Sequence, residues 1–391
     1  MIATTPVIFT TFESLPDPRG EGRNKKHSLH EMIVVALCAT IAGADSWTDV
    51  EQFGNQKVDW FRSFLGLDHG VPSHDTFGRV FAALDTNAFN VALQDWVSQL
   101  QLDLQGRGVH IDGKTARHSF DAATGKNALH LVSAWVDDLN LCLGQVSTDE
   151  KSNEITAVPM LLELLNLRGA VVTLDAMSCQ RKTVAAIRDN DADYLITVKK
   201  NQQKLHDQIQ QVFIEFGEDN FSSNRCRSHT TKKKTGGRVH ETTVSVAAAP
   251  RELKQSGHWA DIATIGMVYR HREADPEAKS RKPIDESDSV TYFISSLPPK
   301  AKLVAKHVAS HWSVENDLHW TLDVTFTEDA SRIRKGNGQE IMGGLRRLAL
   351  SMLKRDTSLG KRSLRCKRSL RCKRKVAGWN TRALQSVLQG N

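Results

Sequence analysis

The sequence lacks the features that mark secreted and membrane proteins. Its longest largely apolar run, residues 32–44, is too short to cross a bilayer and is typical of a buried helix. The first twenty residues contain no basic segment followed by an apolar one, so we expect no signal peptide. These absences predict a cytoplasmic protein without a membrane partner.

Cysteine is scarce and shows no pattern. The cysteines form no CxxC pair and no zinc-finger spacing, and they lie at positions 38, 142, 179, 226, 366 and 372. We therefore expect reduced thiols rather than disulfides or structural zinc. Hydrophobic residues make up 40% and charged residues 25% of the chain, as in soluble globular proteins. A length of 391 residues exceeds what one core usually holds and predicts two or three structural units.

Acidic residues are nearly missing from the last part of the sequence. Residues 331–391 contain 17 Lys and Arg but only 2 Asp and Glu, a balance of +15, so residues 1–330 carry −8 of the total charge of +7. A strongly basic segment favours a polyanionic partner, because counterion release supplies much of the affinity for nucleic acids. A solvated charged tail is the alternative interpretation.

An identical tandem repeat lies within this basic segment. KRSLRC at 361–366 is followed directly by a second KRSLRC at 367–372. Six residues are too few for a solenoid repeat. The repeat indicates a local duplication, which is either functionally neutral or damaging.

Helical patterns occupy residues 1–100. Ser28 and Glu31 have the spacing of a capping box ahead of the apolar stretch that runs to Ile41, and Ser73 is placed to cap a later helix. Short helices joined by tight turns can read DNA, but they serve as often for packing alone. We predict a small helical accessory or DNA-binding domain over residues 1–100.

Strands alternate with helices from residue 107 onwards. The order strand, strand, strand, helix, strand, helix, strand predicts a mixed sheet, the first three strands forming an antiparallel meander. Ribonuclease-H-like folds have this order of elements. The predicted strands are 107–112, 128–136, 141–148, 170–175 and 194–200, and the predicted helices are 155–167 and 179–190.

A second strand-rich region interrupts this fold. Residues 201–216 suit an amphipathic helix, and strand-like stretches follow at 238–247, 262–272 and 289–296. A long helix resumes near Lys300 and carries HWSVENDLHW. We therefore predict a ribonuclease-H-like α/β catalytic domain from 105–216 and 300–350, a β-rich insertion at 217–299 and a basic tail at 351–391.

One motif matches a phosphate-binding P-loop by its letters. GVHIDGKT at 108–115 fits G-x-x-x-x-G-K-[ST], which would predict a nucleotide hydrolase. Strand-like residues lie inside the supposed loop, and no helical apolar stripe follows the lysine. We interpret the string as a coincidence and expect no nucleotide partner.

The same segment makes better sense as a strand that ends in an acid. His110 and Asp112 share one face of this strand, and Thr173 and Asp175 share one face of the strand at 170–175. If the strands are neighbours, the two carboxylates converge at the edge of the sheet. Two close carboxylates repel unless a cation resolves the conflict, and Mg²⁺ prefers such oxygen ligands.

Glu315 is the candidate for a third carboxylate. On one continuous helix, Glu315 falls on the same line as Val304 and Val308 and would continue their buried stripe. A buried acid needs a partner, and a metal shared with the two aspartates is one possibility. A buried ion pair with His311 or His319 is the alternative.

Several long motifs resemble one family of proteins. IDGKTAR, TLDAMSCQ, YLITVKKNQ and HWSVENDLHWTLDVTFTEDASRIRKGN occur in this order, after FESLPDPRGEGRNKKHSLHEMI and VPSHDTFGRVF. Together they resemble the ISAs-type insertion-sequence transposases, which include the H-repeat-associated proteins and are DDE recombinases. The resemblance covers almost the whole chain.

The resemblance implies an acidic triad at Asp112, Asp175 and Glu315. It implies divalent-metal-dependent phosphoryl transfer on DNA with Mg²⁺ or Mn²⁺, the two ions lying about 3.5–4 Å apart. Asp112 would bridge both ions. The implied partners are double-stranded DNA, as terminal inverted repeats and target DNA, and a second copy of the chain on that DNA. The implied location is the bacterial cytoplasm, in association with the nucleoid.

Other residues near the triad are candidates for DNA contacts. Basic and polar residues after the fifth strand, aromatic residues beside Glu315 and basic residues beyond it have suitable chemistry. Ordinary packing is the alternative for the helix-start and aromatic residues. The candidates are Lys199, Lys200, Asn201, Gln202, Trp312, His319, Trp320, Arg332, Arg334 and Lys335.

The chain departs from related proteins at some positions. The Tyr-Arg-Glu-Lys signature of a related insertion-sequence group would need Tyr, Arg and Lys where this chain has Val308, His311 and Leu322. Ala309 and Ser310 stand where ISAs-type proteins have an arginine before the His-Trp pair. Together with the duplicated hexapeptide, these departures leave a decayed transposase that only binds DNA as the alternative function.

Overall fold

The structure is a computed structural model of the chain. It describes residues 6–20, 25–120, 125, 127–148, 154–221, 224–277, 286–358, 361–363, 366–367 and 369–389. The chain divides into a first unit, which contains Met1–Asp103, Gly113–Leu165 and Val314–Asn391, and a second unit, which contains Leu104–Asp112 and Asn166–Ser313. Strand β1 (Gly108–Thr115) begins in the second unit and ends in the first. Each unit is therefore assembled from segments that are far apart in the sequence.

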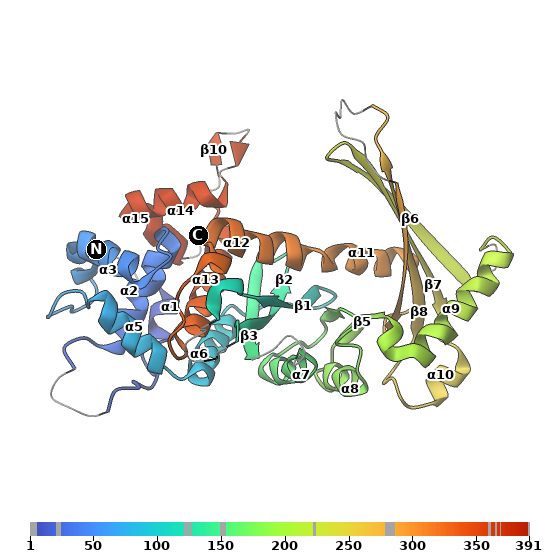
Figure 1. Cartoon of the computed structure of the whole chain (residues 1–391), viewed down its shortest axis with the longest axis horizontal. Coiled ribbons are helices and arrows are strands. Elements are labelled where there is room, and N and C mark those ends of the chain that lie inside the picture. The colour runs from blue at the N-terminus through green and yellow to red at the C-terminus, as the bar shows by residue number, and fades with distance from the viewer. Residues whose placement is uncertain are drawn as a thin grey trace. The chain divides into compact units, whose positions relative to one another are not determined.

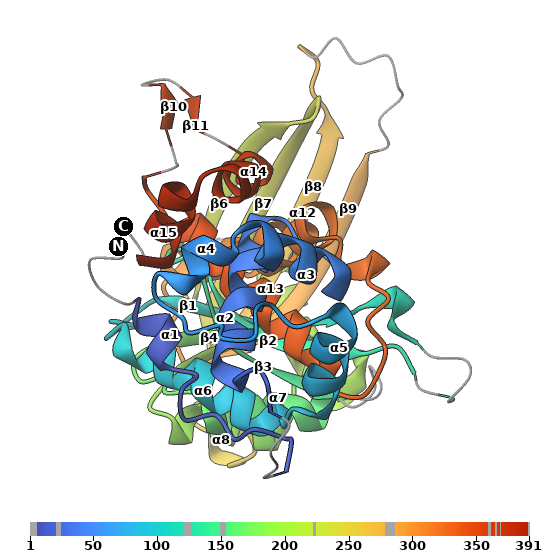
Figure 2. The ribbon, with the colours of Figure 1, turned by 90° about the vertical axis from the view of Figure 1, so that its left-hand side faces the viewer.

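Helix α2 (Leu29–Ala42) is the buried centre of the amino-terminal helices (Figure 2). Every residue from Met32 to Ala39 is 0% exposed, as expected for a helix that is apolar on all sides. Ser28 Oγ accepts a hydrogen bond from the Glu31 amide at 3.0 Å, which confirms the predicted capping box. Among the described residues no single helix is long and apolar enough to cross a membrane, and only α2 taken together with α3, bent by 96°, reaches that length and composition. The neighbouring helices are α1 (Val7–Thr10), α3 (Trp47–Gln56), α4 (Val58–Arg62), α5 (His74–Ala83) and α6 (Thr86–Gln99).

Strands and later helices complete the first unit. β2 (His130–Val136) and β3 (Leu141–Thr148) pair antiparallel, as predicted. Helix α13 (Gly338–Arg355) packs closely against β2 at Gly343, which has no side chain. A Cβ atom at this position would lie only 2.8 Å from Cδ1 of Leu131 in β2. The remaining elements are η1 (Arg117–Ser119), α7 (Glu154–Leu164), η4 (Val314–His319), α12 (Trp320–Phe326), η5 (Glu328–Ala330), β10 (Lys361–Ser363), β11 (Cys366–Lys367), α14 (Leu370–Trp379) and α15 (Thr381–Gln389).

A mixed sheet forms the second unit. Its strands follow the order β1-β4-β5-β9-β8-β7-β6, with parallel pairing from β1 to β5 and antiparallel pairing beyond β5. The strands are β4 (Val171–Leu174), β5 (Asp193–Val198), β6 (Cys226–Thr235), β7 (Arg238–Ala248), β8 (Thr264–Ala274) and β9 (Ser287–Ser295). The helices are α8 (Arg181–Asp189), η3 (Lys200–Gln202), α9 (Gln203–Glu218), α10 (Arg251–Gln255) and α11 (Ala301–His311).

Helices cover both faces of the antiparallel part of this sheet (Figure 1). On one face, Val304 and Val308 of α11 share a buried cluster with Phe293 of β9. On the other face, the Phe213 ring of α9 lies with its centroid 6.3 Å from that of Tyr292. Successive strand residues point to opposite faces, so Tyr292 packs towards α9 and its neighbour Phe293 packs towards α11.

The predicted mixed α/β architecture is confirmed, with three differences in its elements. β1 continues past Asp112 to Thr115, so the prediction that this strand ends at the acid is wrong. β6 was not predicted, because most of its side chains are exposed and no alternation of apolar and polar residues marks the strand. The prediction of one long helix from near Lys300 is wrong. α11 ends at His311, and the following segment η4 is π-helical.

Basic residues near the end of the chain bind helix ends inside the first unit. Lys373 Nζ donates hydrogen bonds to the carbonyls of Leu353 and Asp356, at 2.7 and 2.6 Å, where α13 ends. Arg374 donates to the Thr40 carbonyl in the last turn of α2, at 3.0 Å. Cations stabilise such positions because the last carbonyls of a helix have no partner within it. Part of the basic charge in this segment is therefore internal and is not available to a polyanion.

Replacing Lys373 with Met should destabilise the first unit. Lys373 is 7% exposed, and the fully buried Asp356 carboxylate would lose the ammonium group that lies 3.5 Å away. We expect the free energy of unfolding to fall by about 3 kcal/mol, as when one partner of a buried ion pair is removed. Urea titration at constant pH measures this loss. The control Lys375→Met removes an exposed lysine of the same helix and should cost less than about 0.5 kcal/mol. If both variants lost the same unfolding free energy, the buried ion pair of Lys373 with Asp356 would not be the cause of the loss.

Opposite charges meet around the buried Glu328 in the first unit. The Glu328 carboxylate is 3% exposed, accepts a hydrogen bond from Arg347 Nη1 at 2.8 Å and lies 3.5 Å from Lys114 Nζ. Lys114 Nζ also lies 2.7 Å from the carboxylates of Asp323 and Asp329. Burial alone would raise the pKa of Glu328, but the charges of Arg347 and Lys114 outweigh burial and lower the pKa to about 2.

Acid should remove the stabilisation that ionised Glu328 provides. Its pKa in the folded state lies below the usual 4.5, so the contribution is complete above about pH 4.5 and is lost as the pH falls towards 2. The difference in pKa corresponds to about 3 kcal/mol. Urea unfolding across this pH range should show the stability advantage of the wild type over Glu328→Gln shrinking by that amount. If the difference in unfolding free energy between the wild type and Glu328→Gln stayed constant with pH, the prediction would be contradicted.

Candidate functional site

Asp112 and Asp175 occupy matching positions on two neighbouring strands of the second unit. β1 and β4 pair in parallel, with His110 opposite Thr173. Asp112 and Asp175 each lie two residues further along their strands, so the same register places them opposite each other. Asp175 directly follows Leu174, the last residue of β4. Both aspartates are half-buried. The strands are thus neighbours, as the convergence of the two carboxylates requires.

Hydrogen bonds join α11 to the strand face that carries these aspartates. Thr173 Oγ1 lies 2.7 Å from His110 Nδ1 and 2.7 Å from His311 Nδ1. Because side chains two residues apart share a strand face, His110 and Thr173 point to the same side as Asp112 and Asp175. Burial lowers the pKa of His311 to about 4, so this ring is neutral near pH 7. The carboxyl-terminal end of α11 therefore lies over the face of the aspartates.

Two amide side chains hold the loop that begins at Asp175. Asp175 Oδ1 accepts hydrogen bonds from the amides two and three residues further along, at 3.0 and 3.3 Å. Asn201 Nδ2 donates to the Ala176 carbonyl at 2.6 Å, and Gln202 Nε2 donates to the Cys179 carbonyl at 2.9 Å. The donors that were predicted to contact DNA phosphates are thus engaged within the protein. Sequence reasoning missed this positioning role, because no local pattern links the two segments.

Lys199 and Lys200 differ from the two amide residues that follow them. Both lysines are exposed, at the start of η3. They lie at the end of β5, which neighbours β4 in the sheet. They stay predicted phosphate contacts beside the loop of Asp175.

Glu315, the third predicted carboxylate, lies in the first unit. It is exposed and belongs to η4. The prediction that it continues the buried stripe of Val304 and Val308 is wrong, because the helix type changes after α11. In η4 the buried side chains are Val314 and Leu318.

The histidines that were considered as ion-pair partners of Glu315 have other surroundings. His311 bonds to Thr173, as described above. Burial lowers the pKa of His319 to about 3, so His319 carries no positive charge near neutral pH. An exposed carboxylate also needs no buried counterion. The alternative of a buried salt bridge at Glu315 is therefore contradicted.

The two tryptophans on either side of η4 are exposed instead of forming core. The exposed fraction is 48% for Trp312 and 59% for Trp320. The Arg270 guanidinium lies 5.4 Å from the centroid of the Trp312 ring. Exposed aromatic rings can stack on nucleic-acid bases. Exposure favours the DNA-contact hypothesis over the packing alternative for both residues.

The basic residues predicted beyond Glu315 are not equivalent. Arg332 and Lys335 are exposed. Arg334 Nε donates to the His118 carbonyl at 3.2 Å, and its guanidinium lies 5.4 Å from the centroid of the Phe120 ring. Arg334 therefore orders the segment that follows β1, whereas Arg332 and Lys335 present their charges to solvent.

The string that matches a P-loop is a β-strand. All eight residues of GVHIDGKT lie in β1. Its lysine, Lys114, points into the cluster of carboxylates around Glu328. A P-loop needs a bare backbone curve followed by a helix. The fold therefore contradicts the nucleotide-hydrolase interpretation.

The carboxylates of the second unit suit a hard divalent cation. Within the part of the chain that the structure describes, no three His, Cys, Asp or Glu side chains are grouped as a complete metal site. Mg²⁺ commonly binds one or two protein carboxylates and completes its shell with waters and substrate phosphates. Asp112 and Asp175 offer this pair of oxygen ligands.

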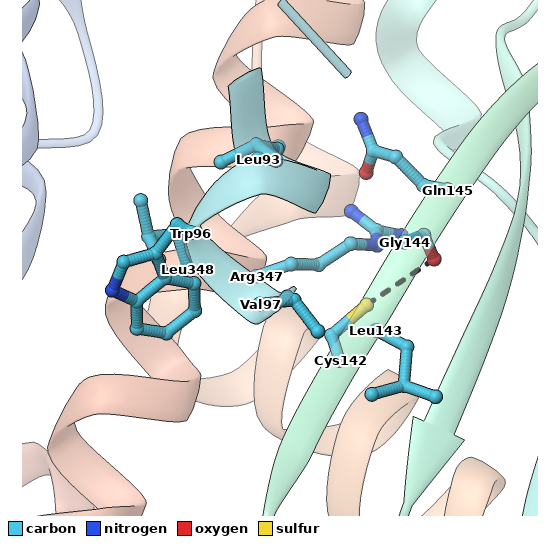
Figure 3. A pocket seen from close by; sticks show the side chains of 10 residues that line it. Leu93, Trp96, Val97, Cys142, Leu143, Gly144, Gln145, Arg347 and Leu348 are labelled. Atoms are coloured by element: carbon cyan, nitrogen blue, oxygen red, sulfur yellow. Dashed lines mark hydrogen bonds between the residues drawn. The ribbon is translucent and has the colours of Figure 1, made fainter. Parts of the chain in front are cut away.

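Figure 3 shows a cavity in the first unit, which is lined by neither Asp112 nor Asp175. It measures about 20 Å³ and lies between α6, β3 and α13, where its lining includes Trp96, Cys142 and Arg347. A space of this size holds about one water molecule. Burial raises the pKa of the Cys142 thiol to about 11, so this cysteine is not a thiolate near neutral pH. The cavity therefore suits neither a metabolite nor thiol chemistry.

Comparison with known proteins identifies relatives along nearly the whole chain. "Putative transposase YncI" of Escherichia coli O157:H7 is 38% identical over 344 residues, which cover 87% of this chain and 85% of the relative. "H repeat-associated putative transposase YhhI" of Escherichia coli K12 is 33% identical over 367 residues, 94% of this chain and 93% of the relative. "Putative protein YbfL" of the same strain is 32% identical over 378 residues, 96% of each chain.

Two family models match the chain in succession. Residues 9–97 match the model described as "DDE_Tnp_1-associated". Residues 102–352 match the model described as "Transposase DDE domain", and this segment contains Asp112, Asp175 and Glu315. The resemblance seen in the sequence motifs is thereby confirmed. The chain belongs to the transposase family that is defined by the DDE domain.

Proposed function

We propose that this protein is an active DDE transposase, which cuts the ends of an insertion sequence and joins them to target DNA with Mg²⁺ or Mn²⁺. The observation that carries the proposal is the shared register of Asp112 and Asp175 on the parallel strands β1 and β4. Their carboxylates stand on one face of the sheet in the segment that matches the DDE domain. Membership of the family makes DNA the proposed substrate.

The aspartates would hold the metal, and the rest of the second unit would keep them in place. A bound pair of divalent ions supplies activation of water or of a DNA 3′-hydroxyl and stabilisation of the leaving oxygen. The hydrogen bonds that the Thr173 hydroxyl shares with His110 and His311 hold β1, β4 and α11 together beside the carboxylates. No side chain has to form a covalent bond to DNA in this scheme.

We assign the third carboxylate of the triad to Glu315. It is exposed, so its oxygens are free of a hydrophobic environment and suit a hydrated ion. It follows His311 by four residues in the chain, and His311 bonds to Thr173 on the face of the aspartates. The π-helical geometry of η4 supports the assignment, because π-helical turns occur frequently at functional sites.

The domain roles follow the same proposal. Residues 105–216 and 300–350 would form a ribonuclease-H-like catalytic domain, which the parallel β1-β4-β5 order supports. Residues 217–299 would be an insertion that supplies β6 to β9, and residues 1–100 an accessory domain. Joining two element ends requires two active sites, so we propose a homodimer on DNA. The proposed place of action is the bacterial cytoplasm, at the nucleoid.

The second copy of the duplicated hexapeptide supplies the N-cap and the first residues of α14. The copies lie between the end of α13 at Arg355 and the first turn of α14 at Leu370. Ser369 caps α14 through a hydrogen bond from the Cys372 amide at 3.2 Å, and Ser363 occupies the same place in the first copy. An insertion in a connection costs little free energy. The duplication therefore gives little support to the alternative of a decayed, DNA-binding protein.

Removing any one carboxylate of the triad should abolish excision. Asp112→Asn, Asp175→Asn and Glu315→Gln keep the shape of the side chain but remove the charge that holds the metal. We expect no detectable excision of a marked element flanked by its native ends, whereas the wild type excises it. Asp317→Asn is the matched control, because Asp317 is an exposed acid of the same π-helical segment and should retain activity.

Each other outcome of this assay has a defined meaning. Excision that persists in the triad variants would refute the site. Inactivity of the wild type would favour the decayed alternative, and deletion of one KRSLRC copy would then test whether the duplication is responsible. Purified wild type should also lose DNA cleavage when EDTA removes the metal and regain it with Mn²⁺.

Asn201→Asp should weaken metal binding without abolishing the fold. The carboxylate cannot donate to the Ala176 carbonyl, so the loop that begins at Asp175 loses one of its anchors. We expect the Mn²⁺ concentration for half-maximal cleavage to rise by about 10- to 100-fold, as for other groups that orient metal ligands. Asn166→Asp is the control, because Asn166 is exposed and its side-chain oxygen only accepts a hydrogen bond. An unchanged Mn²⁺ requirement in Asn201→Asp would refute the positioning role.

A further inference from the structure

The antiparallel strands β6 to β9 separate charge between their two faces. The register places Lys232 opposite Glu241 and Lys233 opposite His240, so adjacent residues of β6 belong to different faces. β8 continues the two rows, with His271 opposite Glu241 and Arg272 opposite His240. Each face can therefore be followed across all four strands.

The face on the side of α9 carries paired charges. Lys232 Nζ lies 2.7 Å from the Glu241 carboxylate. His271 Nδ1 lies 2.8 Å from Asp288 Oδ1, and the Tyr269 hydroxyl donates to the same atom at 2.8 Å. Tyr292, which contacts α9, belongs to this face. Positive and negative groups on this face largely neutralise each other.

The face on the side of α11 is basic. Its inner part is the core shared with α11, which includes Val244 and Val268. Figure 1 shows that the strands continue well beyond α11. Within the described strands this outer part contains no acid, and its polar residues are basic or carry a hydroxyl. They are Thr231, Lys233 and Thr235 of β6, Arg238, His240 and Thr242 of β7, Arg270 and Arg272 of β8, and Ser287 and Ser289 of β9.

Within the described part of the chain, the cations of this face pair with no carboxylate. Among the residues that the structure describes, no ion pair is formed by Lys233, Arg238, Arg270 or Arg272. Arg272 Nε is buried and makes no hydrogen bond to another described residue. The Arg270 guanidinium lies over the face of the Trp312 ring, 5.4 Å from the ring centroid. A set of like charges without counterions is destabilising by itself, which points to an external anion.

The basic face adjoins the end of α11 that faces the aspartates. Trp312 follows the last residue of α11 and lies under the Arg270 guanidinium. The preceding residue, His311, bonds to Thr173 on the strand face of Asp175. The cations and the carboxylate pair therefore lie along one surface of the second unit.

We propose that this basic face binds the phosphate backbone of double-stranded DNA, and the proposal rests on the proposed function. Alternate residues along a strand are about 6.8 Å apart, and neighbouring strands about 4.8 Å, so the face offers a regular grid of cations and hydroxyl donors. Phosphate oxygens are bound by Arg, Lys, Ser and Thr side chains of this kind.

Salt dependence of DNA binding tests the proposal. The full-length protein is titrated onto a labelled mixed-sequence duplex in EDTA, at several KCl concentrations. The double variant Lys233→Ser with Arg238→Ser removes two cations of the basic face, and we expect the slope of log K against log salt to fall in magnitude by about 1.8. Lys233→Gln alone should lower it by about 0.9. The matched control Lys232→Ser with Lys234→Ser removes the same charge from the opposite face of the same strand and should leave the slope unchanged.

The outcomes separate this proposal from the proposed function. An unchanged slope in the basic-face variants, an equal loss in the control pair, or no binding by the wild type would overturn the basic face as a DNA-binding surface. Because EDTA prevents cleavage, an inactive wild type leaves this measurement intact. Asp112→Asn should keep the wild-type slope in EDTA even where it abolishes excision.

Discussion

The parallel pairing of β1 with β4 is the constraint on which the proposed site depends. A slip of one residue would turn one aspartate away from the other, because side chains alternate between strand faces. The pairing resists such a slip. Val109 and Ile111 are buried on one face of β1, and His110 bonds to Thr173 on the other. A shift of β1 by one residue would place the His110 imidazole on the apolar face, without its hydrogen bond to Thr173.

Helix α11 connects this pairing to the rest of the second unit. Along most of its length it supplies apolar side chains to the core of the antiparallel strands. Its last residue, His311, instead makes a polar contact with Thr173. The contacts along this helix thus change from apolar, in the core of the antiparallel strands, to polar, beside the proposed site. The π-helical segment begins just beyond this change.

Local patterns predicted the elements whose surroundings are encoded nearby. The capping box of Ser28, the antiparallel pair of β2 and β3, and the strand that ends just before Asp175 follow from spacing and alternation alone. The burial of Glu315 was predicted wrongly, because helix type depends on packing on both sides of the segment. The loop anchors Asn201 and Gln202 could not be predicted, since their acceptors lie more than twenty residues away in the chain.

In the first unit, residues of α14 near the end of the chain make contact with α2 near its beginning. Arg374 binds the carbonyl of Thr40, and Lys373 binds the end of α13. A ribosome that has released the amino-terminal helices must still add several hundred residues before these contacts can form. A chain that stopped before residue 373 would lack both of these contacts at the ends of α2 and α13.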